Sequence, residues 1–295
     1  MKMNLISYGK KCICFLSLVM LIVSCGNLKE NKVLIIGIDG CRPDALLKAN
    51  TNNIDSLWNN DAFSFNAKTD EISSSGICWT GMLTGVWHDK HNVTTNEYEN
   101  PNIKEFPHFF RRVKQFNPEL ITYSVVQWDP IHKILQDGDA DVVKSFATDE
   151  EVTKEVISNM QENDVDVMFV QFDDVDHAGH AFDFDPSSEK YLKAINIADE
   201  QVGRIIQSLK QRNNYKNENW LVIITTDHGG SNYRHGLNIK EHTTIFYIVS
   251  GDRASKGEIE GVVNVTDVCI TAMQHLGVPI KDEWQLDGKA SGLKN

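Results

Sequence analysis

The chain has 295 residues, is 41% hydrophobic and carries a formal net charge of −12. It can therefore bury a large core, but it lacks the clustered cationic surface with which proteins bind nucleic acid. A small anionic substrate fits this charge if bound metal ions supply positive charge locally.

We predict that residues 1–24 are a signal peptide. Lysines precede an apolar stretch over residues 12–24, which suits a signal-peptide core in length and is short for a membrane span. The stretch ends in Leu-Ile-Val-Ser-Cys, which resembles the bacterial lipobox, whose cysteine is lipidated. Acyl chains on Cys25 would hold the mature protein on a membrane of the bacterial cell envelope, outside the cytoplasm, with residues 25–31 as a tether. The alternative is an uncleaved anchor helix.

Three cysteines remain once the signal peptide is removed and Cys25 carries lipid. Cys41, Cys78 and Cys269 are an odd number without a CxxC spacing. The sequence therefore predicts neither a disulfide framework nor a zinc-thiolate site, and leaves a single bridge open.

Strand-like runs alternate with amphipathic helices over residues 32–295. Five short apolar runs have the character of strands buried on both faces: residues 33–39, 120–126, 166–172, 220–226 and 244–250. The helices between them include one capped by Thr148 and Glu151, one starting at Asp185-Pro186, and one from about Thr266 to Gly277. This alternation predicts a single α/β domain with a mainly parallel sheet.

Carboxylates and imidazoles follow three of these runs. Six such side chains are candidate ligands: Asp39, Asp176, His180, Asp227, His228 and His235. Because sites in parallel sheets form at the carboxyl ends of the strands, we expect them to converge. Each residue alone is compatible with a turn or a surface loop, but together they indicate oxygen and nitrogen ligands of divalent ions such as zinc. A pair of such ions suits displacement at phosphorus.

A serine-rich segment supplies a candidate nucleophile. Residues 73–85 read SSSGICWTGMLTG, and LTGVWHDKHNV resembles the LTG-x(5)-HG segment of the alkaline phosphatase superfamily, closest to its type I phosphodiesterase/nucleotide pyrophosphatase branch. In that branch the nucleophilic Thr or Ser lies ten residues before the Gly of LTG, which here is Ser75. The family motifs IDG, D-x(3)-H, DHG and HG fall on the six candidate ligands, and the segment VTDVCITAMQHLGVP resembles the final helix of the superfamily, so the resemblance spans Val33 to Lys289.

The resemblance implies an alkaline-phosphatase-like three-layer α/β/α fold with two divalent metal ions, zinc or else manganese. By family analogy, one ion is held by Asp39, Ser75, Asp227 and His228, and the other by Asp176, His180 and His235. His242 is an alternative to His235, and Ser73 or Ser74 is an alternative to Ser75. A hydroxyl at a helix start suits an attacking alkoxide, since the unpaired N–H groups favour negative charge there.

The implied function is hydrolysis of a small anionic phosphodiester through a covalent phosphoseryl intermediate. The alternatives are a phosphomonoesterase, another phosphonyl or sulfuryl hydrolase, or a non-catalytic surface lipoprotein that keeps its metals. No protein partner is predicted. The nucleotide pyrophosphatases that the chain resembles usually carry an Asn three residues after the nucleophile to hold a phosphate oxygen, and Cys78 stands there. The resemblance therefore implies that an oxyanion donor is missing or is supplied by backbone N–H groups. The sulfatase signature, Cys or Ser followed by x-Pro-x-Arg, is absent.

Overall fold

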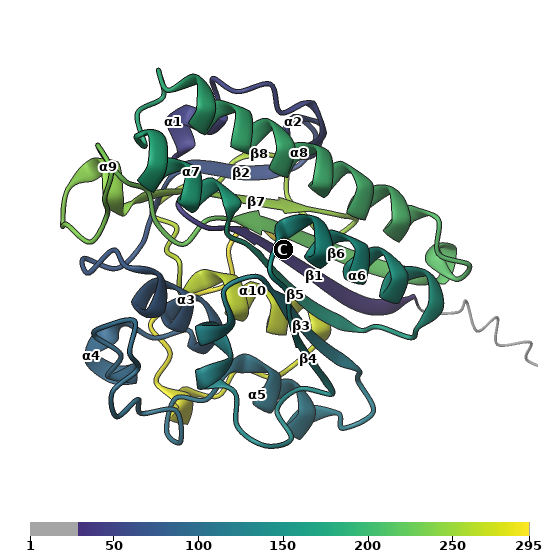
Figure 1. The fold of residues 1–295 in the computed structure, drawn as a ribbon. Coiled ribbons are helices and arrows are strands. Elements are labelled where there is room, and N and C mark those ends of the chain that lie inside the picture. Colours follow the sequence, from purple (N-terminus) through teal and green to yellow (C-terminus); the bar gives the residue numbers. More distant parts are fainter. Residues whose placement is uncertain (1–28, 295) are drawn as a thin grey trace, which may run out of the picture.

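The computed structural model describes residues 29–294, and the predicted signal peptide and Cys25 lie outside this range. A central eight-stranded sheet has the strand order β4-β3-β5-β1-β6-β7-β2-β8 (Figure 1). The strands are β1 (Glu30–Ile38), β2 (Ala62–Lys68), β3 (Thr122–Val126), β4 (Val142–Ser145), β5 (Val167–Phe172), β6 (Glu218–Thr225), β7 (Thr244–Ser250) and β8 (Gly257–Glu258). Within residues 29–294, none of the helices combines the length and apolar character needed to cross a membrane.

Helices cover both faces of this sheet. They are α1 (Pro43–Leu46), α2 (Asn52–Trp58), α3 (Ser75–Thr84), α4 (His88–His91), α5 (Phe109–Phe116), α6 (Asp149–Glu162), α7 (Asp174–Phe182), α8 (Glu189–Lys210), α9 (Lys240–Thr243) and α10 (Asp267–Leu276). The sheet is mainly parallel: β1 pairs in parallel with β5 and β6, and β7 runs antiparallel to β6 and β2. The predicted three-layer α/β/α architecture is confirmed.

The central strand β1 shows how the core is divided between the two faces. Val33 and Ile35 pack into the cluster formed with α3, α5 and α10. Leu34 and Ile36 pack into the cluster formed with α6, α7 and α8. Successive side chains of a strand point to opposite faces, so an unbroken apolar run is what a sheet covered on both sides requires.

The structure differs from the sequence prediction in two kinds of element. β2 and β4 were not predicted, because neither reads as a continuous apolar run and β4 is largely exposed. Helix α8 begins at Glu189 and not at Asp185-Pro186, since the Asp185 carboxylate accepts from the backbone N and hydroxyl of Ser187 and closes a turn first. The Thr148 cap of α6 is as predicted, with its hydroxyl accepting from the Glu151 N–H.

Gly37 in β1 leaves the space that the Trp79 ring occupies. A Cβ atom on Gly37 would lie 2.3 Å from that buried ring. We expect Gly37→Ala to lower the free energy of unfolding by about 1–3 kcal/mol through overpacking, measured by urea denaturation. Gly81→Ala is the matched control, because its Cβ would have its nearest neighbour at 3.4 Å and helical Ala is favoured over Gly. Equal stability of the two variants would contradict this account of β1.

Candidate metal centre

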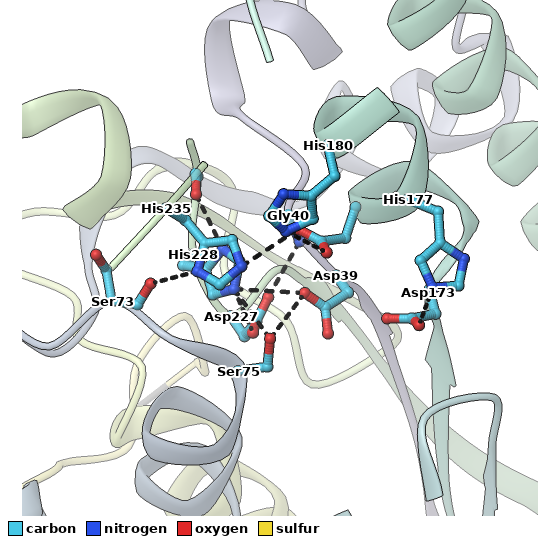
Figure 2. Close-up of polar contacts among 12 residues, drawn as sticks. Asp39, Gly40, Ser73, Ser75, Asp173, His177, His180, Asp227, His228 and His235 are labelled. Atoms are coloured by element: carbon cyan, nitrogen blue, oxygen red, sulfur yellow. Dashed lines mark hydrogen bonds and ion pairs between the residues drawn. The ribbon is translucent and has the colours of Figure 1, made fainter. Parts of the chain in front are cut away.

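All seven predicted site residues meet at one edge of the sheet, and all of them except Asp176 are labelled in Figure 2. Asp39 follows β1, and Asp227 and His228 follow β6, the parallel neighbour of β1. Asp176 and His180 lie on α7, which follows β5 on the other side of β1. Ser75 begins α3, and His235 lies on the loop before α9. The strand order β5-β1-β6 therefore brings together residues that are far apart in the chain.

The first group of contacts surrounds the Ser75 hydroxyl. Its oxygen lies 3.1 Å from Nε2 of His228 and 3.5 Å from Oδ1 of Asp39. Nε2 of His228 also lies 3.3 Å from Oδ2 of Asp227 and 3.5 Å from Oδ1 of Asp39. Two carboxylates, one imidazole and one hydroxyl thus point at a common position.

The second group surrounds Asp176. Its Oδ2 lies 3.3 Å from Nε2 of His180, and its Oδ1 lies 3.9 Å from Nε2 of His235. The rings of His228 and His235 stack at 3.9 Å, so the two groups are contiguous. Their ligand atoms form candidate metal-binding sets, one of Asp39, Asp227 and His228 and one of Asp176, His228 and His235.

The three imidazoles share one tautomer. Nδ1 of each ring lies within hydrogen-bond distance of a backbone carbonyl: His228 at 2.9 Å from Gly229, His235 at 3.1 Å from Ser73, and His180 at 2.8 Å from Tyr233. A carbonyl oxygen can only accept, so Nδ1 carries the proton in each neutral ring and Nε2 presents its lone pair. Such an outer hydrogen bond is the usual orienting device of a metal-binding histidine.

Burial controls the ionisation of these groups. It lowers the pKa of His228 and of His235 to about 3, so both rings are neutral at neutral pH. It also raises the pKa values of Asp39 and Asp227, which repel each other and Asp176. His180 is more exposed, and its pKa is raised because the protonated ring can donate a hydrogen bond from Nε2 to Asp176.

The acceptor atoms of these residues repel one another, and a divalent cation between them would relieve that repulsion. Oδ1 of Asp176 and Oδ2 of Asp227 are buried and have no hydrogen-bond partner among residues 29–294. Each faces an imidazole lone pair, so acceptors point at acceptors, an arrangement that costs free energy unless positive charge lies between them. Carboxylate oxygen and neutral imidazole nitrogen are ligands of zinc and manganese.

The structure places the alternative residues elsewhere. Nδ1 of His242 accepts from the Leu237 N–H, and its Nε2 contacts the Ser231 hydroxyl, so this ring braces the loop that carries His235. The Ser73 hydroxyl donates to the Leu237 carbonyl. His242 and the Ser73 hydroxyl thus make their contacts outside the cluster, whereas His235 and Ser75 face it.

Gly40 allows the loops after β1 and β5 to approach closely. It has φ +64°, and a Cβ atom there would lie 2.5 Å from Oδ1 of Asp176. Its backbone N–H donates to Oδ1 of Asp227 at 3.2 Å. The absent side chain therefore lets one backbone turn touch carboxylates of both groups.

Two residues at the site were not predicted from the sequence. Oδ1 of Asn96 accepts from the Gly76 N–H at 2.9 Å, which sets its carboxamide beside the start of α3. Trp79, on α3, is fully buried and donates to Oδ2 of Asp39 at 2.8 Å. Asn96 comes after α3 and α4 in the chain, so no local pattern links it to Ser75.

A residue of α6 holds the start of helix α7 in place. The buried carboxylate of Asp149 accepts from the backbone N–H groups of Asp173 and Asp174, at 2.8 and 3.1 Å. These are unpaired donors at a helix start, so Asp149 acts as its cap from another element. The orientation of Asp176 and His180 thus depends on the docking of two helices.

Comparison with known proteins agrees with this geometry. The sequence matches the family described as type I phosphodiesterase / nucleotide pyrophosphatase over residues 33–137 and 113–262. It is 32% identical over 137 residues to 2,3-bisphosphoglycerate-independent phosphoglycerate mutase 2 of Methanosarcina acetivorans, covering 45% of this chain and 24% of the relative. A mutase of Clostridium tetani is 31% identical, with 45% and 25% covered. These matches span about a quarter of each relative's length.

Solved structures share the fold at low sequence identity. Murine ectonucleotide pyrophosphatase/phosphodiesterase 5, an inactive variant in complex with AMP, superposes with a TM-score of 0.69 at 14% identity, covering 85% of this chain and 96% of that one. A 2-O GAG sulfatase superposes with a TM-score of 0.68 at 13% identity, covering 89% and 73%. The same architecture therefore occurs in proteins named for phosphate and for sulfate chemistry.

His177 makes a pH-dependent contact beside the site. Its hydrogen bond to Asp173, at 3.0 Å, raises its pKa from 6.5 to about 9. A raised folded-state pKa gives stability that is complete below pH 6.5 and is lost as the pH rises through about 9. We expect His177→Gln to flatten the decline of the urea midpoint over this range in chelator-treated protein. The effect should be small because the ring is largely exposed, and parallel profiles would disprove it.

Proposed function

This chain belongs to the type I phosphodiesterase/nucleotide pyrophosphatase family and is an enzyme of the phosphoryl-transfer hydrolase type, and we propose that it hydrolyses a phosphodiester bond in a small anionic substrate. One observation carries the proposal. The Ser75 hydroxyl faces two contiguous groups of buried carboxylates and neutral imidazoles whose acceptor atoms point at one another. A nucleophile beside a binding place for divalent cations is what displacement at phosphorus requires.

Two metal ions would be held by the residues of the two groups. Asp39, Ser75, Asp227 and His228 form the first set, and Asp176, His180 and His235 form the second. When bound, zinc or manganese would supply positive charge that lowers the pKa of the Ser75 hydroxyl and offsets the charge of the phosphate oxygens.

Ser75 then reacts in two displacements. The Ser75 hydroxyl gives up its proton, and its oxygen forms a bond to phosphorus while the bond from phosphorus to the leaving alcohol or phosphate oxygen breaks. The leaving oxygen departs with the electron pair and takes up a proton. Water next attacks the phosphoseryl group, the bond between phosphorus and Ser75 breaks, and the serine hydroxyl is restored. The products are the leaving group and a phosphomonoester.

Asn96 supplies the oxyanion donor that the first turn of α3 lacks. Its carboxamide oxygen is engaged by the Gly76 N–H, which leaves the amide N–H groups for a phosphate oxygen. The N-terminus of α3 adds unpaired backbone donors and the positive end of the helix dipole. Negative charge that develops on the transferring group would therefore meet donors already fixed in place.

A substrate panel separates the diesterase from its alternatives. We expect p-nitrophenyl thymidine monophosphate to be hydrolysed faster than p-nitrophenyl phosphate and p-nitrophenyl sulfate, with zinc or manganese added. Faster hydrolysis of the monoester or of the sulfate would assign the alternative activity. The absence of the Pro and Arg of the sulfatase signature after Ser75 argues against the sulfate ester. Metal retention with no turnover on any substrate would favour the non-catalytic alternative.

Ser75→Ala tests the nucleophile. We expect turnover to fall on the order of 10⁴-fold or more while thermal stability stays near wild type, because the oxygen that forms the covalent bond is lost. Ser74→Ala is the matched control, since this neighbour caps α3 without a side-chain hydrogen bond to it. The assignment is wrong if Ser75→Ala keeps its turnover or if the control loses it.

We also propose that the mature protein is anchored through lipid on Cys25. The support is the lipobox-like segment that precedes this cysteine and the short spacing to β1, which begins at Glu30. Cys25→Ala should move the protein from the detergent phase to the aqueous phase when cells are partitioned with Triton X-114. A variant that stays in the detergent phase would point to the uncleaved anchor helix.

A further inference from the structure

We infer that Gln171 takes the place of a third cation beside the metal centre. Its buried amide joins the carboxylates of Asp39 and Asp173 and leaves one Asp39 oxygen for the ion next to Ser75. This inference rests on the two-metal centre proposed above and concerns a positioning residue, not one that touches substrate.

The starting observation is a third acidic group at the site. Ligand oxygens of Asp39, Asp173 and Asp176 lie within 4.8 Å of one another, and all three side chains are buried. Three carboxylates at such distances repel one another, so something must supply positive charge or N–H donors. By geometry alone, this group would be a further place for a metal ion.

The side-chain amide of Gln171 supplies N–H donors to two of these carboxylates, and its oxygen is also hydrogen-bonded. Its Nε2 donates to Oδ2 of Asp39 and to Oδ1 of Asp173, both at 3.2 Å. Its Oε1 accepts from the backbone N–H groups of Gln127 at 3.1 Å and Trp128 at 2.9 Å. Carboxylates only accept and backbone N–H groups only donate, so these partners determine which end of the amide is which.

As a result, the two carboxylate oxygens of Asp39 have different partners. Oδ2 receives N–H groups from Trp79 and Gln171, whereas Oδ1 faces Ser75 and His228. Asp173 is engaged in the same way, because its second oxygen contacts His177, which points toward it (Figure 2). Protein N–H groups thus occupy the space between Asp39 and Asp173, and we expect two ions per chain.

Zinc binding measured with a competing chromophoric chelator tests this inference without reference to turnover. We expect Gln171→Met to bind one of its two zinc ions about 10–100-fold more weakly, as is typical when an outer partner of a metal ligand is lost, and to keep the other near wild-type affinity. A general loss of structure would weaken both ions together. Gln127→Met is the matched control, because its amide bonds Asp174 and does not touch Asp39.

Gln171→Glu provides a second variant that keeps an acceptor for the two backbone N–H groups. It replaces the N–H donors with an oxygen, so three carboxylates would face one another, and we expect one additional divalent ion per chain by metal analysis. Wild-type zinc affinity and stoichiometry in both variants, or three ions in the wild type, would overturn the inference. Those results would leave the hydrolase proposal intact, and an inactive wild type that binds two ions would leave this inference intact.

Discussion

The site depends on a mutual repulsion that the protein alone does not relieve. His228 and His235 donate hydrogen bonds from Nδ1 to backbone carbonyls. Their Nε2 lone pairs therefore face the carboxylates of Asp227 and Asp176. Burial keeps both rings neutral at neutral pH, so protonation of Nε2 does not relieve the repulsion between each imidazole and its carboxylate. This arrangement favours the binding of divalent cations, because positive charge placed between the acceptor atoms makes their proximity favourable.

The sheet keeps these carboxylates and imidazoles close together despite their repulsion, because they are attached to rigid strands and helices. β1 lies between β5 and β6, and the residues after these three strands supply the carboxylates and imidazoles. Outer contacts then orient each ligand: Trp79 and Gln171 hold one oxygen of Asp39, and Asp149 caps the helix that carries Asp176. Because these contacts come from the core and from neighbouring helices, the geometry of the site is a property of the whole fold.

The fold by itself does not select the reaction. The same architecture superposes on a pyrophosphatase/phosphodiesterase and on a sulfatase at 14% and 13% identity. Around α3 this chain has a serine hydroxyl at the helix start, Asn96 against the first turn, and no Pro and Arg of the sulfatase signature after Ser75. These residues bear on which ester can be positioned, whereas the carboxylates and imidazoles bear on metal binding.

The sequence by itself predicted the α/β class and, through the family resemblance, the three-layer fold and a set of candidate site residues in which His242 stayed an alternative to His235. It did so because a buried parallel strand is a local apolar run, and the residue that follows it lies at that edge wherever the strand sits. Only the tertiary structure decided between His235 and His242, showed Trp79 as a buried donor, and brought in Asn96 and Gln171. Those outcomes depend on which segments pack together across the sheet, and contacts between residues far apart in the chain leave no periodic signal in it.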